Sequence, residues 1–375
     1  MIKKNILFFI NTLSCGGAEK VLVDLVNKLE HEYDITVVSV LGGTYENRLS
    51  KSVKYRKIIN CKCAYLQKIL SKIIFKTPHY LFNLLFLNKR FDIEIAYLGG
   101  FSTNIIAHRS SKANKIAFVH TDVSQSGKYD NLYRNKQEAL NVYNRFNTVC
   151  FVSEVAKSGF EKKYGKLSNS YIIHNVIDVD AIKAQAEKSI EHDYATKGLR
   201  MISVGRLSYE KGFDRLIRIA KKLEDEFDFE LWILGEGSER QKLEALIEDE
   251  QVRSVKLLGY QQNPYSFVKK ADLYVCSSHF EGYSTSVTEA VVLGVPVLTT
   301  DCAGMREILR DNIDGIIVDN NETELEAKIK ELLCNNSLYH SIKVGAQEKS
   351  QFYSNEYALR EYDELFSHCL KHSDD

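Results

Sequence analysis

Residues 272–300, DLYVCSSHFEGYSTSVTEAVVLGVPVLTT, contain the repeating unit of the fold. The apolar runs at 272–277 and 295–300 have the length of buried strands, and apolar residues recur at helical spacing through 285–293. Gly294 and Pro296 follow the helical segment as stop signals. Because two short buried strands joined through a helix run parallel, the stretch predicts a βαβ unit.

The same alternation of short apolar runs and helical segments extends in two series along the chain. Expected strands of the first series are 5–10, 35–40, 93–98, 115–119, 148–152 and 170–174, and those of the second are 200–205, 230–235, 254–259, 272–277, 295–300 and 315–319. The polar segment between the two series contains no strand pattern. We therefore predict two doubly wound α/β domains, 1–176 and 199–350, with a linker at 177–198 and a terminal helix at 351–375.

Composition narrows the class of protein. Fifty basic residues balance fifty acidic ones, so nucleic acid is not an expected partner. The eight cysteines have no framework spacing, which favours reduced thiols in a cytoplasmic protein. The apolar run after Lys3 and Lys4 is too short to span a membrane, and we interpret it as a first buried strand rather than a signal peptide.

Charge is distributed unevenly in one segment. Residues 48–90 contain eleven Lys and Arg residues and no Asp or Glu, and lysines interleave with apolar residues around 64–86. This pattern is typical of a segment that binds an anionic membrane surface. The alternative is one or two helices that face the core and keep their lysines in solvent.

Two glutamates flank the glycine and hydroxyl-rich part of the opening stretch. Glu281 is expected in a loop and Glu289 within the following helix, while the backbone amides of Ser284, Thr285 and Ser286 form an anion site at the helix start. This order suits a ligand with hydroxyls at both ends and phosphate between. The alternative is a pair of solvated surface acids beside an ordinary helix cap.

Other candidate residues also follow strands. Arg206 and Lys211 share one strand-to-helix loop, where two cations can neutralise a diphosphate without a metal. Gly16 and Gly17 follow the first strand without the spacing of a dinucleotide motif, so they predict either close approach of a ligand or a plain turn. His120 ends another strand and is either a cleft residue or structural.

Asp178 and Asp180 form a D-x-D triplet, which in another class of transferase binds a metal ion. Because the triplet falls in the expected linker, metal binding there is the less favoured interpretation.

Taken together, several motifs resemble the retaining glycosyltransferases of family 4. They include GGAEKVLVDL (16–25), FVHTD (118–122), FVSEVAKSGF (151–160), VGRLSYEKGFDRLI (204–217), FEGYSTSVTEA (280–290) and GVPVLTTDCAGMREIL (294–309), and their order covers nearly the whole chain. The resemblance implies a GT-B fold of two facing Rossmann-like domains with an interdomain cleft. The family often has glycine where Val176 stands and Pro or Leu after E-G, where this chain has Tyr283 and Ser284.

The resemblance also implies roles for the candidate residues. Arg206 and Lys211 would hold the donor diphosphate, Glu289 the ribose and Glu281 the hydroxyls of the transferred sugar. Gly16 and Gly17 would approach the donor phosphates, the backbone around Tyr260 would line the base, and the amides of Ser284, Thr285 and Ser286 would meet phosphate. His120 would lie beside the anomeric carbon and the acceptor.

The function expected from this resemblance is retaining transfer of a hexose or N-acetylhexosamine from a nucleoside-diphosphate sugar, expected to be a UDP-sugar. The acceptor would be a saccharide or lipid-linked saccharide of surface polysaccharide synthesis, and the enzyme would need neither cofactor nor metal. It would be cytoplasmic, with residues 48–90 on the inner face of the plasma membrane. Alternatives are a non-catalytic sugar-nucleotide-binding partner of another transferase and a nucleotide-sugar epimerase.

Overall fold

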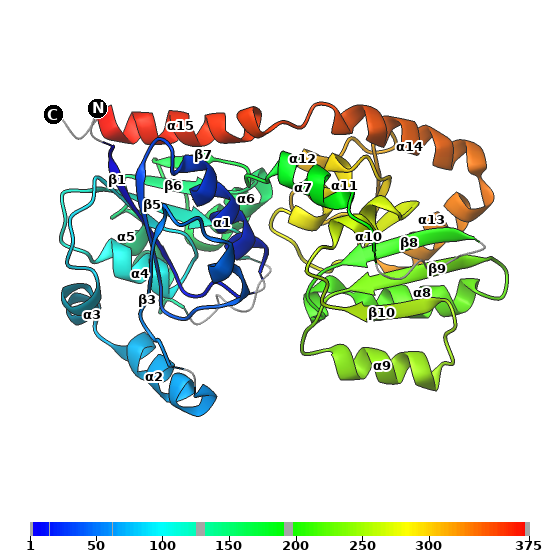
Figure 1. Ribbon diagram of the computed structural model, residues 1–375, viewed down its shortest axis with the longest axis horizontal. Coiled ribbons are helices and arrows are strands. Elements are labelled where there is room, and N and C mark those ends of the chain that lie inside the picture. Colours follow the sequence, from blue (N-terminus) through cyan, green and yellow to red (C-terminus); the bar gives the residue numbers. More distant parts are fainter. Residues whose placement is uncertain (1–2, 15, 62, 125–131, 191–197, 372–375) are drawn as a thin grey trace. The chain divides into compact units, whose positions relative to one another are not determined.

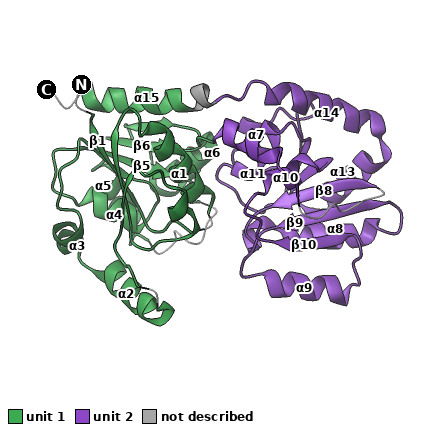
Figure 2. Cartoon of the chain, viewed as in Figure 1, with its two compact units in different colours: residues 1–177, 356–375 green, residues 178–355 purple. Residues whose placement is uncertain are grey.

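The computed structural model describes residues 3–14, 16–61, 63–124, 132–190 and 198–371 (Figure 1). It divides into two compact units: unit 1 comprises residues 1–177 and 356–375, and unit 2 comprises residues 178–355 (Figure 2). Each unit contains one parallel sheet covered by helices, as the alternating strand and helix patterns predict.

Unit 1 is built on a seven-stranded sheet of order β3-β2-β1-β4-β5-β6-β7 in which every pair is parallel. Its strands are β1 (Asn5–Ile10), β2 (Asp34–Ser39), β3 (Lys54–Lys57), β4 (Ile93–Ala96), β5 (Asn114–Val119), β6 (Thr148–Phe151) and β7 (Ser170–Ile172). Its helices are α1 (Gly17–Leu29), η1 (Thr44–Arg48), α2 (Ala64–Lys76), α3 (His79–Phe86), α4 (Phe101–Ala107), α5 (Lys136–Tyr143), α6 (Glu154–Tyr164) and, from residue 356 on, α15 (Asn355–Lys371).

Unit 2 is built on a six-stranded parallel sheet of order β10-β9-β8-β11-β12-β13. Its strands are β8 (Leu199–Val204), β9 (Phe229–Leu234), β10 (Val255–Gly259), β11 (Leu273–Cys276), β12 (Val297–Thr300) and β13 (Ile316–Val318). Its helices are α7 (Val179–Ala186), η3 (Tyr209–Lys211), α8 (Phe213–Leu223), α9 (Arg240–Asp249), α10 (Tyr265–Lys269), α11 (Thr285–Val292), α12 (Met305–Ile308), α13 (Glu322–Cys334) and α14 (Asn336–Ser350).

The chain differs from the sequence expectation at three elements. β3 was not expected, because its residues KYRK lack an apolar pattern; it is an edge strand, where charged side chains remain in solvent. The expected linker at 177–198 contains α7, which packs on α10 within unit 2. The terminal segment returns from unit 2 to unit 1, where α15 completes the core.

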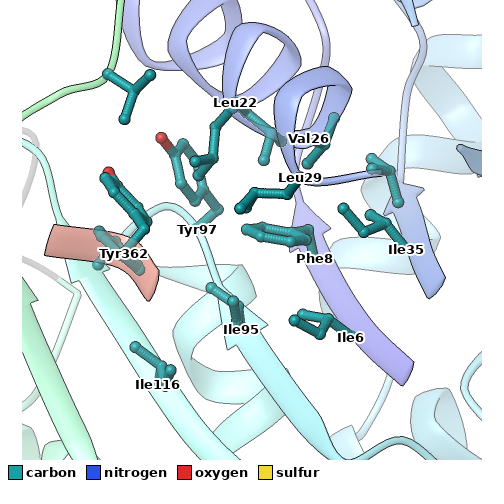
Figure 3. Packing of buried hydrophobic residues seen from close by; sticks show 14 of the residues in the cluster. Ile6, Phe8, Leu22, Val26, Leu29, Ile35, Ile95, Tyr97, Ile116 and Tyr362 are labelled. Atoms are coloured by element: carbon teal, nitrogen blue, oxygen red, sulfur yellow. The ribbon is translucent and has the colours of Figure 1, made fainter. Parts of the chain in front are cut away.

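The core of unit 1 shows how α15 is held. Figure 3 shows Tyr362 of this helix beside Tyr97, with Phe8 of β1 and Ile95 of β4 on the neighbouring strands. Tyr362 also stacks on Phe118, with ring centroids 5.9 Å apart and ring planes 6° from parallel. Burial of these large apolar surfaces stabilises the helix on the sheet.

Both sheets reverse their strand order at one point, which positions the candidate residues. The reversal lies between β1 and β4 in unit 1 and between β8 and β11 in unit 2. In such sheets, ligands bind beyond the carboxyl ends of the strands at this point. No helix among the described residues combines the length and hydrophobicity that crossing a bilayer requires.

Candidate functional site

The switch point of unit 2 joins two sequence candidates that lie 70 residues apart. Lys211 ends η3 after β8, and Glu281 lies in the loop after β11. Lys211 Nζ donates to Glu281 Oε1 at 2.6 Å, and Ser278 Oγ donates to the same oxygen at 2.7 Å. The fold thus places a cation and a carboxylate together beyond the carboxyl ends of the two central strands.

The pair is partly withdrawn from solvent, with side chains 24% exposed for Lys211 and 11% for Glu281. Burial acts to lower the pKa of Lys211, but the Glu281 carboxylate acts in the opposite direction, and the pKa is raised above its ordinary value. Lys211 therefore stays charged at neutral pH and can offer a charge-assisted hydrogen bond to an anion.

The two loops that carry this pair are joined to each other by further contacts. Ser277 Oγ donates to the carbonyl oxygen of Lys211 at 2.9 Å, and the backbone amide of His279 donates to the carbonyl oxygen of Glu210 at 2.8 Å. The rings of His279 and Tyr209 stack with centroids 4.7 Å apart. These contacts fix the position of Lys211 relative to Glu281.

Two glycines allow the close approach of these segments. Gly212 has φ of +60°, a left-handed conformation that ends η3 and starts α8. Gly235, after β9, has φ of +142°, and a Cβ there would lie 1.8 Å from the carbonyl oxygen of Gly205. Any side chain at position 235 would push the loop that carries Arg206 and Lys211 out of place.

Arg215 is a residue that sequence reasoning missed. Its side chain is 4% exposed, and it donates to the carbonyl oxygen of Ser277 and, at 3.0 Å, to Oδ1 of Asn320. Asn320 in turn donates to the carbonyl oxygen of His279 at 2.9 Å. Arg215 thus holds the loop that carries Glu281 through its contacts to Ser277 and Asn320. The only signal in the sequence is a charged residue at the edge of the apolar stripe of α8.

The helix after the Glu281 loop begins as predicted. Ser284 caps α11, its hydroxyl accepting from the amide of Val287 at 3.5 Å, so Thr285 and Ser286 form the first turn. Amides in a first helical turn have no acceptor within the helix and can meet an anion. Glu289 lies one turn further, 7% exposed, and accepts from the Tyr265 hydroxyl at 3.5 Å.

Arg206 and Tyr260 both lie beyond the carboxyl ends of strands of unit 2, after β8 and β10. Arg206 is exposed in the loop after β8, and Tyr260, 43% exposed, follows β10 directly. Arg206 is close enough to contribute to lowering the pKa of Glu210, after that residue's backbone and Ser208 hydrogen bonds. Both cations expected from the sequence, Arg206 and Lys211, therefore follow the carboxyl end of β8.

Gly16 and Gly17 lie between β1 and α1 in unit 1. Gly16 caps α1 with an ordinary extended backbone, φ −119°, and Gly17 is its first residue. A Cβ at Gly16 would lie on the side chain of Glu19, whose carboxylate also accepts from Thr12 Oγ1 at 3.4 Å. Both glycines thus follow the first strand, as the sequence predicts, at the switch point of unit 1. The backbone of Gly16 is not strained.

His120 follows β5 in unit 1 and lies against the ring of Tyr97, centroid to centroid 4.6 Å. Burial lowers its pKa to about 4, so the imidazole is neutral at physiological pH. The backbone of Tyr97 and the side chain of Asn175 act to raise that pKa, yet neither ring nitrogen has a hydrogen bond of good geometry to any described residue.

Further buried polar atoms lie near the Tyr97 ring on which this histidine packs. Asn175 Oδ1 and the hydroxyls of Tyr97 and Tyr362 are also buried without a partner of good geometry among the described residues. Figure 3 shows the Tyr97 and Tyr362 hydroxyls at the same end of their neighbouring rings. Because buried polar groups are rarely left unsatisfied, these atoms keep unused capacity for hydrogen bonds.

The D-x-D triplet has a structural role. Asp178 caps α7, its carboxylate accepting from the amide of Ala181 at 3.1 Å. Across the described ranges, no three His, Cys, Asp or Glu side chains are grouped as a metal site would require.

Comparison with known families divides the chain much as the structure does. Residues 15–181 match the model of Glycosyltransferase Family 4, and residues 184–349 match that of Glycosyl transferases group 1. The first match covers the strands of unit 1 from β2 to β7, and the second covers all strands of unit 2, β8 to β13.

Two curated relatives match over part of the chain. One is an uncharacterized glycosyltransferase of Methanocaldococcus jannaschii, 36% identical over 160 residues, which are 41% of this chain and 39% of that protein. The other is the N-acetylgalactosamine-N,N'-diacetylbacillosaminyl-diphospho-undecaprenol 4-alpha-N-acetylgalactosaminyltransferase of Campylobacter jejuni, 33% identical over 183 residues, 48% of each chain. The chain thus spans about half the length of these relatives or less.

A solved structure matches almost the whole chain in fold. The crystal structure of Anabaena HepE in complex with UDP-glucose has a TM-score of 0.76 and 18% identity, covering 97% of this chain and 100% of the other. The architecture of two Rossmann-like units is therefore that of the GT-B fold.

Proposed function

The chain belongs to the glycosyltransferases of family 4 with the GT-B fold, and we propose that it moves a hexose or N-acetylhexosamine from a nucleoside-diphosphate sugar to a saccharide or lipid-linked saccharide. The donor in this proposal is a UDP-sugar. The match to a structure that contains UDP-glucose supports this choice of nucleotide.

The single observation that carries the proposal is the Lys211–Glu281 pair at the switch point of unit 2. In the proposed complex, Lys211 and the exposed Arg206 bind the diphosphate together with the first amides of α11. Glu281 orients sugar hydroxyls, Glu289 accepts from the ribose and the backbone at Tyr260 lines the base. These proposed contacts, in this order, match a ligand in which a sugar, a diphosphate and a nucleoside are joined in line.

The proposed reaction breaks the bond between the anomeric carbon and the diphosphate oxygen. The acceptor oxygen forms the new bond on the same face of the sugar, and the acceptor proton leaves with the diphosphate, so configuration is retained. Lys211, Arg206 and the start of α11 stabilise the negative charge of the leaving group, and we propose that no metal ion is needed. For unit 1 we propose separate roles: Gly16 and Gly17 allow close approach of a ligand, and neutral His120 accepts or donates a hydrogen bond to the acceptor.

The proposed acceptor belongs to surface polysaccharide or glycolipid synthesis. Relatives named for lipopolysaccharide core synthesis in Rhizobium meliloti and for amylovoran synthesis in Erwinia amylovora support this class, as does the Campylobacter jejuni relative, named for an undecaprenol-linked acceptor. We propose a cytoplasmic protein that works at the inner face of the plasma membrane.

The test is a panel of UDP-, GDP- and ADP-sugars incubated with undecaprenyl-diphosphate saccharides, with products identified by mass spectrometry and their anomeric configuration by NMR. Consumption of one donor with formation of an axial product from an axial donor supports the proposal. An inverted product would refute retention, an isomerised donor would identify an epimerase, and donor binding without turnover would identify a non-catalytic partner.

Metal independence is tested separately with excess chelator. Full activity in chelator is expected because protein cations balance the diphosphate charge. Loss of activity that manganese restores would refute this part of the proposal.

A further inference from the structure

Helix α2 presents its apolar side to solvent. Tyr65, Leu66, Ile69, Leu70 and Ile73 are all exposed, and at ~100° per residue they span about 140° of the helix circumference. On the opposite side, Gln67, Ser71 and Ile74 are only half-buried, and none of the thirteen residues of α2 is buried. This orientation is the reverse of that expected for a helix that packs on a core.

One aromatic contact near its C-terminal end attaches this helix to α4 of unit 1. The ring of Phe75 meets that of Phe101 on α4 at 4.8 Å, and Figure 1 shows α2 projecting from the rest of the unit. Unit 1 thus holds the end of α2 that carries Phe75, while the apolar side of the helix faces solvent.

Helix α3 continues the exposed apolar surface. Its Phe82 and Asn83 are buried: Phe82 packs on Phe101 at 5.3 Å, and Asn83 Nδ2 donates to the carbonyl oxygen of Ile105 at 3.1 Å. Its other side exposes Tyr80, Leu81, Leu84 and Leu85. Of the eighteen large apolar side chains exposed among the described residues, ten lie between Tyr65 and Leu85, so the patch is concentrated on these two helices.

Positive charge borders this patch. Lys68, Lys72 and Lys76 are exposed at successive four-residue steps along one flank of α2, so they lie beside the apolar side. None of the three has an ion pair to any described residue, and residues 48–90 contain no acid that could neutralise them. An apolar face with lysines at its edge matches the boundary between acyl chains and anionic headgroups.

We propose that α2 and α3 form a docking surface for an anionic lipid bilayer, with α2 lying in the plane of the interface and its apolar side among the acyl chains. The lysines then contact headgroup phosphates, and the body of unit 1 stays in water. A protein partner with an apolar groove is less well matched, because three unpaired lysines flank the surface on which it would have to close.

This inference refines the proposed membrane-associated function but is tested without donor or acceptor, so that vesicle binding and transferase activity can fail independently. The purified chain is sedimented with vesicles of phosphatidylcholine alone or mixed with phosphatidylglycerol. We expect binding to the anionic vesicles only, and weaker binding at high salt.

Variants separate the two parts of the surface. Lys68→Glu/Lys72→Glu/Lys76→Glu is expected to lower vesicle partitioning more than about 100-fold. A matched variant, Lys183→Glu/Lys188→Glu/Lys269→Glu, makes the same change of net charge on exposed lysines of unit 2 and should retain binding within about threefold. Leu66→Ser/Ile69→Ser/Ile73→Ser keeps the charges and is expected to lose binding through loss of the apolar face.

A fluorescence measurement tests insertion directly. Tyr65→Trp is expected to be quenched by brominated acyl chains, whereas Tyr171→Trp on β7 is not, and the buried native Trp232 provides a constant background. Failure of the chain to bind anionic vesicles, binding unchanged by the Lys68/Lys72/Lys76 substitutions, or a dimer that the serine variant dissolves would each overturn the proposal.

Discussion

At the level of single residues, the pairing of Lys211 with Glu281 determines what the proposed donor site can bind. In the structure, each group is the other's charged partner, at 2.6 Å. A diphosphate would compete with the Glu281 carboxylate for the Lys211 ammonium, whereas a sugar hydroxyl would donate to the carboxylate. The two residues should therefore affect nucleotide binding in opposite directions.

We predict that Lys211→Met lowers UDP affinity about 10- to 100-fold, because a charge-assisted hydrogen bond is lost. Glu281→Gln should instead raise UDP affinity about fivefold, since Lys211 loses its competing carboxylate, while transfer of the sugar falls sharply. Calorimetric titration with UDP measures the first two effects and product formation the third.

The Lys256–Glu230 ion pair between β10 and β9 supplies the matched control. Lys256→Met and Glu230→Gln make the same chemical changes in the same unit and should leave UDP affinity unaltered. Equal loss of UDP affinity in Lys211→Met and Glu281→Gln would contradict the proposed roles.

The lowered pKa of buried His120 predicts that the stability of the folded chain depends on pH. Its folded-state pKa, lowered to about 4 by burial, is below the unfolded value of about 6.5, so the unfolded chain binds the proton more tightly. Stability from this group is complete above pH 6.5 and is lost as pH falls toward 4, by on the order of 2–3 kcal/mol. Urea unfolding of the wild type and His120→Gln at several pH values should show a steeper fall for the wild type. Parallel curves would contradict the prediction.

At the level of elements, helical and strand patterns locate most segments because their periods are local. The helix-period stretches GAEKVLVDLVNKL (17–29) and EVAKSGFEKKY (154–164) of the sequence coincide with α1 and α6. The pattern of α15 predicts a helix but does not show which core its apolar side joins. The ring of Phe366 lies 6.5 Å from Phe8 and 5.6 Å from Tyr33, which attaches the end of the chain to its beginning.

We predict that Phe366→Ala lowers the free energy of unfolding of unit 1 by about 3–5 kcal/mol, because a fully buried aromatic ring is removed. Phe352→Ala is the control, since that ring is 81% exposed, and should change stability by less than about 0.5 kcal/mol. Chemical unfolding followed by circular dichroism measures both. Similar small effects would show that α15 is not part of the unit 1 core.

At the level of the whole molecule, the chain forms two units with separate cores. The sequence indicates this division through its two strand series, although it does not show that α7 belongs to unit 2 or that the last helix returns to unit 1. These two features depend on contacts between residues far apart in sequence, such as Tyr362 with Phe118.

Because the proposed phosphate and ribose contacts lie in unit 2, UDP should slow hydrogen exchange mainly there. We expect protection at residues 205–212 and 277–290, where amides and side chains are proposed to meet the nucleotide. Hydrogen exchange with mass spectrometry measures it, with the sheet edge at β3 as an unaffected reference. Protection confined to unit 1 would contradict the assignment of the donor site.

Hydrophobic period and turn residues are local signals, and they predict the two α/β units and nearly all strands along the chain. They also predict that Lys211, Glu281 and His120 follow strands and that Glu289 lies in the next helix. Contacts in the folded chain alone show that Lys211 meets Glu281, that Arg215 holds the loop after β11 and that the apolar side of α2 faces solvent. A helical period defines two faces but not which one meets the body, because that choice depends on contacts made far along the chain.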